Sequence, residues 1–176
     1  KILDRRSYGT YLSDGMLAEL AALERAIRAH CRHIVGVHQW RMQHDKHVSD
    51  LTLQKLIPLE NLDADMLRSG ACNYIKQLLE AIYDLHSENV VHCDLKLDNT
   101  MYDAQEDEIK LIDFGLAKLD CDTKPPDKAM MTFDYRSPEA LLMSNNIDLK
   151  KADMWAVGVC AASIMLGLGK HSVYYK

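Results

Sequence analysis

The stretch HCDLKLDN at residues 92–99, followed by DFG at residues 113–115, decides the fold and the chemistry expected of this chain. The first string places Asp94, Lys96 and Asn99 within six residues. The second string adds another carboxylate, Asp113, after a short predicted hairpin. Either string alone is a weak signal, but the two strings in this order and at this separation are a strong one.

These four polar side chains match the needs of one kind of chemistry. Phosphoryl transfer requires an acid that receives a hydroxyl proton, a cation beside the moving phosphate and two groups that hold Mg²⁺. Asp94 is the candidate catalytic base and Lys96 the candidate phosphate stabiliser. Asn99 and Asp113 are the candidate metal ligands, because hard cations prefer oxygen ligands. Polar turns are the plain alternative, but they leave the apolar Phe114 directly after the acid unexplained.

The two strings resemble the catalytic loop and the metal-binding loop of protein kinases, H-R-D-L-x-x-x-N and D-F-G. The resemblance implies transfer of the γ-phosphate of ATP, with Mg²⁺, to serine or threonine of protein substrates, because Lys96 stands where tyrosine kinases usually have alanine. TFDYRSPE at residues 132–139 resembles the end of an activation segment, closest to that of DYRK-type kinases in the CMGC group. Thr132 would then touch Asp94 and Lys96. Arg136 would set the pocket after the acceptor, where this group often prefers proline.

The resemblance also assigns the groups that bind the nucleotide. Lys1 resembles the lysine at the end of the V-A-I-K strand, which holds the α- and β-phosphates. Its partner would be a glutamate on the following helix, and Glu19 is preferred because Leu23, one turn later, is apolar and shares its face. Glu24 stays open, because the stretch after Glu19 is longer than the family usually shows. The backbone of Ile57 in the hinge would contact the adenine.

Two further positions bear on regulation and on the shape of the loop. Cys93 stands where most regulated kinases have an arginine that grips a phosphorylated residue, and a thiol cannot pair with phosphate. DYRK and CLK kinases also carry H-C-D, so catalysis is still expected, and modification of tyrosine as well as serine or threonine stays open. DMWAVG at residues 153–158 resembles the start of a buried helix, whose Asp153 would hold the catalytic-loop backbone by hydrogen bonds.

Hydrophobic periodicity predicts strands early in the chain and helices late. The predicted elements are helices over 14–30, 67–87 and 148–166, a hairpin of 34–42 and 50–57, a linker over 58–62, short strands and turns over 88–112, and a surface loop over 116–135. The third helix is expected to bury five apolar side chains, those of Trp155, Val157, Val159, Ile164 and Met165.

The fold class that follows is α+β, a bilobal kinase-like fold that is incomplete. Residues 1–62 would be part of the small lobe with the hinge, and residues 63–176 part of the large lobe. The chain starts at Lys1, so we expect the glycine-rich phosphate loop and the later C-terminal helices to lie outside it, and the 176 residues alone to be inactive.

Composition narrows the function classes. The net charge of −5 argues against nucleic acid or an anionic membrane as the main partner. Five scattered cysteines without C-x-x-C spacing predict reduced thiols in the cytoplasm or nucleus, and no zinc site. The competing interpretations are a pseudokinase or scaffold that uses the fold for binding and, less favoured, a small-molecule phosphotransferase. No feature of the sequence indicates a regulatory subunit.

Overall fold

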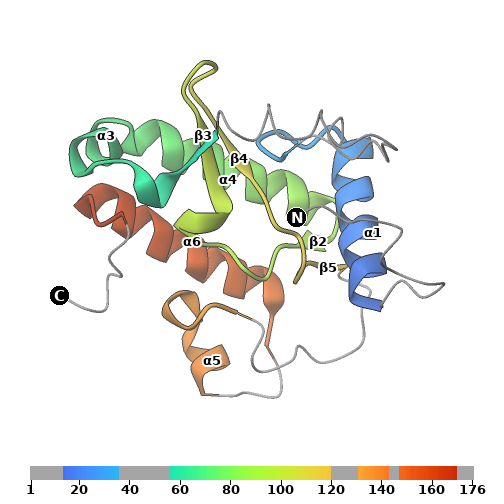
Figure 1. Cartoon of the computed structure of the whole chain (residues 1–176). Coiled ribbons are helices and arrows are strands. Elements are labelled where there is room, and N and C mark those ends of the chain that lie inside the picture. Colours follow the sequence, from blue (N-terminus) through green and yellow to red (C-terminus); the bar gives the residue numbers. More distant parts are fainter. Residues whose placement is uncertain (1–13, 36–55, 120–130, 143–146, 170–176) are drawn as a thin grey trace, which may run out of the picture.

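The fold is described here from a computed structural model that covers residues 14–35, 56–119, 131–142 and 147–169. The helices are α1 (Asp14–Arg28), α3 (Ala64–Ser69), α4 (Ala71–Ser87), α5 (Pro138–Leu141) and α6 (Leu149–Leu166), with 3-10 turns η2 (Leu59–Asn61), η3 (Leu97–Asn99) and η4 (Phe133–Tyr135). The strands are β1 (Leu56–Pro58), β2 (Val90–Val91), β3 (Thr100–Asp103), β4 (Glu108–Leu111) and β5 (Lys118–Leu119). Small antiparallel sheets therefore lie among longer helices, as the α+β prediction requires (Figure 1).

The sheets carry the segments on both sides of the predicted catalytic residues. One sheet has the strand order β1-β3-β4, and the other pairs β2 with β5. In the β3–β4 hairpin, Thr100 lies opposite Leu111. Leu111, the last residue of β4, also bonds to the segment after α1. Its amide donates to the carbonyl of His33 at 2.7 Å, and its carbonyl accepts the amide of Val35 at 3.0 Å. The segment after α1 is thus bonded directly to the strand that leads to Asp113.

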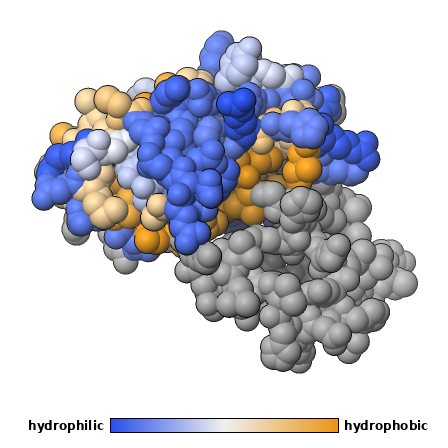
Figure 2. Space-filling view, turned by 90° about the horizontal axis from the view of Figure 1, so that it is seen from above, coloured by the Kyte–Doolittle hydropathy of each residue, from blue (hydrophilic) through white to orange (hydrophobic). Residues whose placement is uncertain are grey.

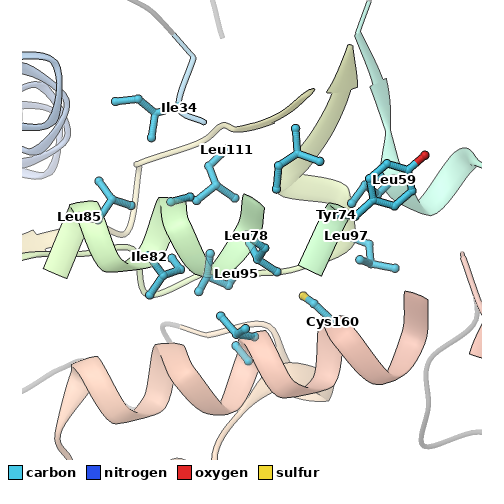
Figure 3. Packing of buried hydrophobic residues seen from close by; sticks show 14 of the residues in the cluster. Ile34, Leu59, Tyr74, Leu78, Ile82, Leu85, Leu95, Leu97, Leu111 and Cys160 are labelled. Carbon is cyan, nitrogen blue, oxygen red and sulfur yellow. The ribbon is translucent and has the colours of Figure 1, made fainter. Parts of the chain in front are cut away.

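Helix α4 is the centre of the hydrophobic core. Its buried side chains recur at helical spacing, which is the amphipathic pattern expected of a core-facing helix. In Figure 3 they lie between Leu111 of β4 on one side and Cys160 of α6 on the other. The residues of this cluster that α4 contributes include Tyr74, Leu78, Ile82 and Leu85.

Helix α6 is capped at both ends. The side chain of Asp148 accepts the amide hydrogen of Lys151 at 3.2 Å, which satisfies a backbone donor of the first turn. Gly167 follows the last turn with φ of 66°, a left-handed conformation that favours glycine. The predicted helix over 148–166 is confirmed.

The burial predicted for α6 is wrong at two positions. Val157 and Ile164 are buried as expected and Val159 is half-buried, but Trp155 is 42% exposed and Met165 is 63% exposed. The helix is apolar around most of its circumference, so periodicity could not select the buried face. That face carries small side chains, among them Ala156 and Cys160, which let α6 approach its neighbours closely.

The helix predicted over 67–87 is two helices. α3 ends and α4 begins at Gly70, which caps both. A Cβ atom at residue 70 would overlap the ring of Tyr74, which is itself buried and packs edge-to-face against Tyr102 with ring centroids 5.2 Å apart. The break depends on this packing, which hydrophobic periodicity does not report.

The other predicted elements agree with the structure in part. The helix over 14–30 is confirmed as α1, and the short strands over 88–112 are confirmed as β2, β3 and β4. The surface loop expected over 116–135 instead contains β5, paired with β2, and the turn η4. Most of the expected hairpin of 34–42 and 50–57 lies outside the described residues, and its last residues form β1, paired with β3.

The surface of the described part is mixed in polarity. Seen from above, it is mostly hydrophilic, and hydrophobic residues gather along one side (Figure 2). Among the helices of the described part, none combines the length and the apolar character that a membrane-spanning helix needs.

Two glycine substitutions should have opposite effects on stability. Gly70→Ala should lower the free energy of unfolding by about 1–3 kcal/mol, because the added methyl group overlaps the buried ring of Tyr74. Gly158→Ala should raise it by about 0.5–1 kcal/mol, because the added group in the interior of α6 meets no atom of the described part within 4 Å other than its chain neighbours and the nearby helix backbone. Urea unfolding of both variants measures the two shifts. A loss of stability in both variants, or in neither, would contradict this packing.

Candidate active site

The loop between β2 and β3 is held by its apolar residues and presents its polar ones. Leu95 and Leu97 are fully buried in the core beside α4 and α6 (Figure 3). Asp94 and Lys96 alternate with them and remain partly accessible. Residues that alternate along an extended chain point to opposite sides, so burial of the leucines fixes the direction of the two charged side chains.

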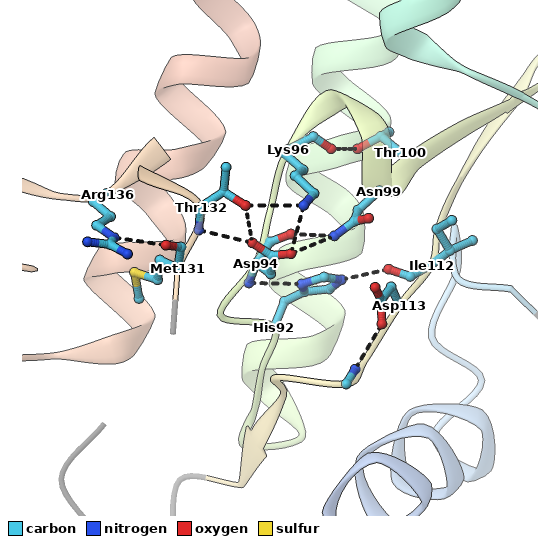
Figure 4. Close-up of polar contacts among 11 residues, drawn as sticks. His92, Asp94, Lys96, Asn99, Thr100, Ile112, Asp113, Met131, Thr132 and Arg136 are labelled. Carbon is cyan, nitrogen blue, oxygen red and sulfur yellow. Dashed lines mark hydrogen bonds and ion pairs between the residues drawn. The ribbon is translucent and has the colours of Figure 1, made fainter. Parts of the chain in front are cut away.

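Asp94 is the centre of a group of four side chains (Figure 4). Its Oδ1 accepts the hydroxyl of Thr132 at 2.7 Å and the amide of Thr132 at 3.2 Å. Its Oδ2 lies 3.1 Å from Lys96 Nζ and accepts the amide of Asn99 at 3.0 Å. Lys96 Nζ also donates to the hydroxyl of Thr132 at 3.1 Å. The predicted contact of Thr132 with Asp94 and Lys96 is therefore confirmed, across 36 residues of chain.

These contacts set the charge of Asp94. Burial by itself would raise the pKa of the Asp94 carboxyl, but hydrogen bonds from Thr132 and Lys96 and the charge of Lys96 outweigh it, so the pKa lies below its usual range. The group is therefore an ionised carboxylate at neutral pH. It can orient a hydroxyl that approaches it and accept the proton as the hydroxyl oxygen forms a new bond.

Asn99 is positioned to offer an oxygen ligand. Its Nδ2 donates to the backbone carbonyl of Asp94 at 2.9 Å as well as to the carboxylate, so its Oδ1 is turned away from both. The side chain is buried, and its backbone carbonyl accepts the amide of Ile112 at 3.0 Å. An amide oxygen held in one direction suits a hard cation such as Mg²⁺.

Asp113 follows β4 and is exposed, unlike the other polar residues of the site. Its φ is 60°, a left-handed conformation that aspartate tolerates better than most residues. Its Oδ1 accepts the amide of Gly115 at 3.3 Å, which leaves Oδ2 available. Within the described ranges, no three His, Cys, Asp or Glu residues form a closed metal site. The donor set fits a cation that keeps water or phosphate ligands, as Mg²⁺ usually does.

His92 connects the loop to the segment that carries Asp113. Its Nδ1 accepts the amide of Asp94 at 3.3 Å, and its Nε2 donates to the carbonyl of Ile112 at 3.1 Å, which is the pattern of a neutral imidazole. Burial lowers the pKa of His92, although Asp153 and other nearby groups oppose this shift. The ring also packs on Phe114, with centroids 4.9 Å apart. Phe114 thus belongs to the core, which explains an apolar residue directly after the acid.

The predicted role of Asp153 in holding the loop backbone is confirmed. This side chain is 1% exposed, and it accepts the amides of His92 and Cys93, both at 2.9 Å. Cys93 has φ of 64°, which is unfavourable for a residue other than glycine, asparagine or aspartate. A conformation of this kind costs on the order of 1–3 kcal/mol and persists only where its surroundings hold it. The hydrogen bonds to Asp153 are that support.

The remaining predicted residues are placed as follows. Glu19 is 8% exposed on α1, whereas Glu24 is exposed and pairs with Arg28, so Glu19 is the glutamate that faces inward. Ile57 lies in β1 opposite Tyr102, with a partly exposed side chain. Lys1 lies outside the described residues. The functional roles of these residues remain predictions.

Arg136 lies behind Thr132. Its Nε donates to the carbonyl of Met131 at 2.8 Å, and its guanidinium lies 5.6 Å from the centroid of the exposed Phe133 ring. The carbonyl of Met131, the residue before Thr132, is therefore already hydrogen-bonded to the charged side chain of Arg136 (Figure 4).

The sequence did not single out two residues that touch this site. His86 of α4 lies 3.0 Å from the Asp153 carboxylate, and a histidine near the end of an amphipathic helix gives no signal of such a contact. Thr100 donates its hydroxyl to the carbonyl of Lys96 at 3.0 Å. A threonine that opens a buried strand is a faint signal, because a hydroxyl there needs a partner.

Replacement of His92 should reveal the pH dependence that its burial causes. His92→Phe keeps a ring against Phe114 but removes both hydrogen bonds, so it should lower the free energy of unfolding at pH 8 by about 1–3 kcal/mol. Below about pH 6.5 the unfolded wild-type chain binds a proton at His92 that the folded chain excludes. The free energy of unfolding of the wild-type protein therefore decreases as the pH is lowered. The difference between the two proteins should therefore narrow from pH 8 to pH 5 in urea unfolding. A difference that widens on acidification would contradict the neutral, buried state of His92.

Comparison with known proteins agrees with this geometry. Mitogen-activated protein kinase 5 of Arabidopsis thaliana is 37% identical over 100 residues, which are 56% of this chain and 26% of that protein. Serine/threonine-protein kinase dkf-2 of Caenorhabditis briggsae is 30% identical over 173 residues, 90% of this chain and 13% of that protein. A calcium/calmodulin-dependent serine/threonine-protein kinase of Malus domestica is 35% identical over 100 residues, 56% of this chain and 24% of that protein. The chain spans about a quarter or less of the length of these relatives.

The family comparison covers nearly the whole chain. Residues 1–172 match the family described as protein kinase domain. The match includes the loop around Asp94, the Asp113 segment and the Thr132 segment. In the structure, Thr132 contacts Asp94 directly, and His92 links the loop to the segment that leads to Asp113. The chain therefore belongs to the protein kinase domain family.

Proposed function

We propose that the protein transfers the γ-phosphate of ATP to serine or threonine hydroxyls of protein substrates, with Mg²⁺ as the metal. The observation that carries the proposal is the direct contact of the Asp94 carboxylate with Lys96, Asn99 and Thr132. A carboxylate that receives a hydroxyl proton beside a fixed ammonium group is the arrangement this reaction needs. The serine/threonine kinases among the relatives support the same substrate class.

Each residue has a separate part in this proposal. Asp94 orients the acceptor hydroxyl and takes its proton, and Lys96 neutralises charge on the transferred phosphate. The oxygen of Asn99 and the carboxylate of Asp113 would hold Mg²⁺, which would offset the negative charge of the phosphates. Thr132 fixes the side of Asp94 that faces the substrate.

The nucleotide would bind between the part of the chain up to residue 62 and the part from residue 63. Lys1 and Glu19 would clamp its α- and β-phosphates, and the backbone of Ile57 would contact the adenine. The inward-facing position of Glu19 on α1 supports the first assignment.

We further propose that the enzyme favours substrates with proline after the acceptor. The resemblance places that residue beside the segment of Met131 and Arg136. Because Arg136 already donates to the carbonyl of Met131, this carbonyl is a poor partner for a substrate amide. A substrate residue with an N–H group would bury that group without a full hydrogen bond, whereas proline has no N–H group to bury.

The regulatory proposal rests on Cys93. Its thiol is buried, and burial raises its pKa well above the usual range, so it is a neutral group that cannot bind phosphate. We therefore propose a kinase of the CMGC group with DYRK-like traits, whose activity does not depend on a phosphate held at this position. Action on tyrosine as well as serine or threonine and a cytoplasmic or nuclear location belong to the same proposal.

The central test is phosphate transfer from labelled ATP to a generic basic protein by the full-length protein. Asp94→Asn should lower the turnover by about 10²–10⁴-fold, because the variant lacks the proton acceptor. Asp65→Asn is the matched control, since this side chain is 98% exposed on α3 and pairs with Arg68. Transfer should also require Mg²⁺. Equal turnover in both variants would contradict the role of Asp94, and no transfer by well-folded wild-type protein would favour a scaffold.

The proline preference is tested with two peptides that differ only in the residue after the acceptor serine, proline or alanine. The wild-type protein should show a kcat/KM about 5–100-fold higher for the proline peptide. Arg136→Leu frees the Met131 carbonyl, so it should reduce this ratio. The ratio is measured within each variant and does not depend on how much of the protein is folded. A ratio near one in the wild-type protein would disprove the preference.

A further inference from the structure

We propose that Thr100 is a positioning residue for Lys96 and acts by holding the Lys96 carbonyl. The contact of Thr100 is with the backbone of Lys96 and not with its ammonium group. It is the first residue of β3, directly after the metal ligand Asn99. Figure 4 shows its hydroxyl directed back along the loop toward the backbone of Lys96. The inference rests on the proposed phosphoryl transfer.

The environment of Thr100 explains why its hydroxyl must bind at this place. The residue is 0% exposed and lies opposite Leu111 in the sheet. A hydroxyl buried among apolar neighbours costs free energy unless it forms a hydrogen bond. The Thr100 hydroxyl forms this bond with the Lys96 carbonyl at 3.0 Å. Valine has a similar shape but no hydroxyl, so Thr100→Val removes this bond with little change in packing.

The Lys96 carbonyl receives two hydrogen bonds. The amide of Asn99 donates to it at 3.1 Å and closes the turn η3, and the Thr100 hydroxyl donates to it at 3.0 Å. Lys96 itself is extended, with φ of −163° and ψ of 166°, and precedes this turn. The Asn99 bond alone defines the turn. The second bond ties the peptide plane of Lys96 to the rigid strand β3 and fixes the direction in which the side chain leaves the backbone.

This direction matters because the ammonium group of Lys96 must reach two neighbouring groups at once. Its ammonium group lies 3.1 Å both from Asp94 Oδ2 and from the Thr132 hydroxyl. A lysine side chain has many rotamers, so its placement depends strongly on a fixed backbone. A small rotation of the Lys96 peptide would move the charge away from the phosphate in the transition state. The loss should fall on kcat, because ATP is held mainly by other groups.

The test compares Thr100→Val and Thr100→Ser with the wild-type full-length protein. Thr100→Val removes the hydroxyl but keeps the shape, and it should lower kcat about threefold to tenfold with the KM for ATP unchanged. Thr100→Ser keeps the hydroxyl and should restore most of kcat. Tyr102→Phe is the matched control, because it deletes another hydroxyl hydrogen bond on the same strand, to Asp107 at 3.0 Å, away from Lys96. This control should keep the wild-type kcat.

A double substitution separates positioning from a general effect on folding. In a Lys96→Met background there is no ammonium group left to place, so adding Thr100→Val should not lower kcat further. Loss of the same factor in both backgrounds would contradict action through Lys96. Failure of Thr100→Ser to restore kcat would contradict it as well.

The outcomes also distinguish this inference from the function on which it rests. Phosphate transfer by the wild-type protein with an unchanged kcat in Thr100→Val would overturn the role of Thr100 alone. A wild-type protein without any transfer would overturn the proposed reaction and, with it, this role. A fall in kcat that Tyr102→Phe reproduces would show that Thr100 only stabilises β3.

Discussion

The buried carboxylate of Asp153 accepts the backbone amides of His92 and Cys93, and the geometry of the site depends on this interaction. It holds Cys93 in a left-handed conformation, and this turn sends Asp94 out of the core while Leu95 returns to it. The carboxylate comes from α6, which α4 packs against, so the longest helices of the described part position a loop that has little regular structure of its own. Backbone strain and its support are thus located at the functional residues, as is common in enzymes.

From this anchor, polar contacts extend in two directions. Asp94 gathers Lys96, Asn99 and Thr132, and it is kept ionised by two of them despite its burial. On the other side, the neutral His92 ring bridges the amide of Asp94 and the carbonyl of Ile112, next to Asp113. The loop of Asp94 and the segment of Asp113 are therefore joined through one imidazole. His92 is 0% exposed, and its burial favours the neutral form that both hydrogen bonds need.

The fold class and the residues that meet around Asp94 could be predicted from sequence, but several local details of the fold could not. Phosphoryl transfer requires particular side chains at particular spacings, so Asp94, Lys96, Asn99 and Asp113 could be named from two short strings, and Asp153 from a third. The break at Gly70 could not, because it depends on the ring of Tyr74 packed against Tyr102, and the apolar pattern runs through it without interruption. The exposure of Trp155 and Met165 could not be predicted for a related reason. Helix α6 is apolar on nearly every side, so the apolar pattern does not indicate which face is buried. Thr100 was missed because its role lies in one hydroxyl and its partner.

The bonds between the segment after α1 and β4 have a further consequence for solubility. An unpaired strand edge is a template for pairing with another chain, and small sheets are vulnerable to it. Ile34 forms a parallel bridge with Leu111, and the bonds through His33 and Val35 occupy the amide and carbonyl of Leu111 on the outer side of β4. On the opposite strand of this sheet, β1 ends in Pro58, which has no amide to offer. Both outer strands of the sheet that leads to Asp113 thus carry a feature that opposes edge-to-edge association.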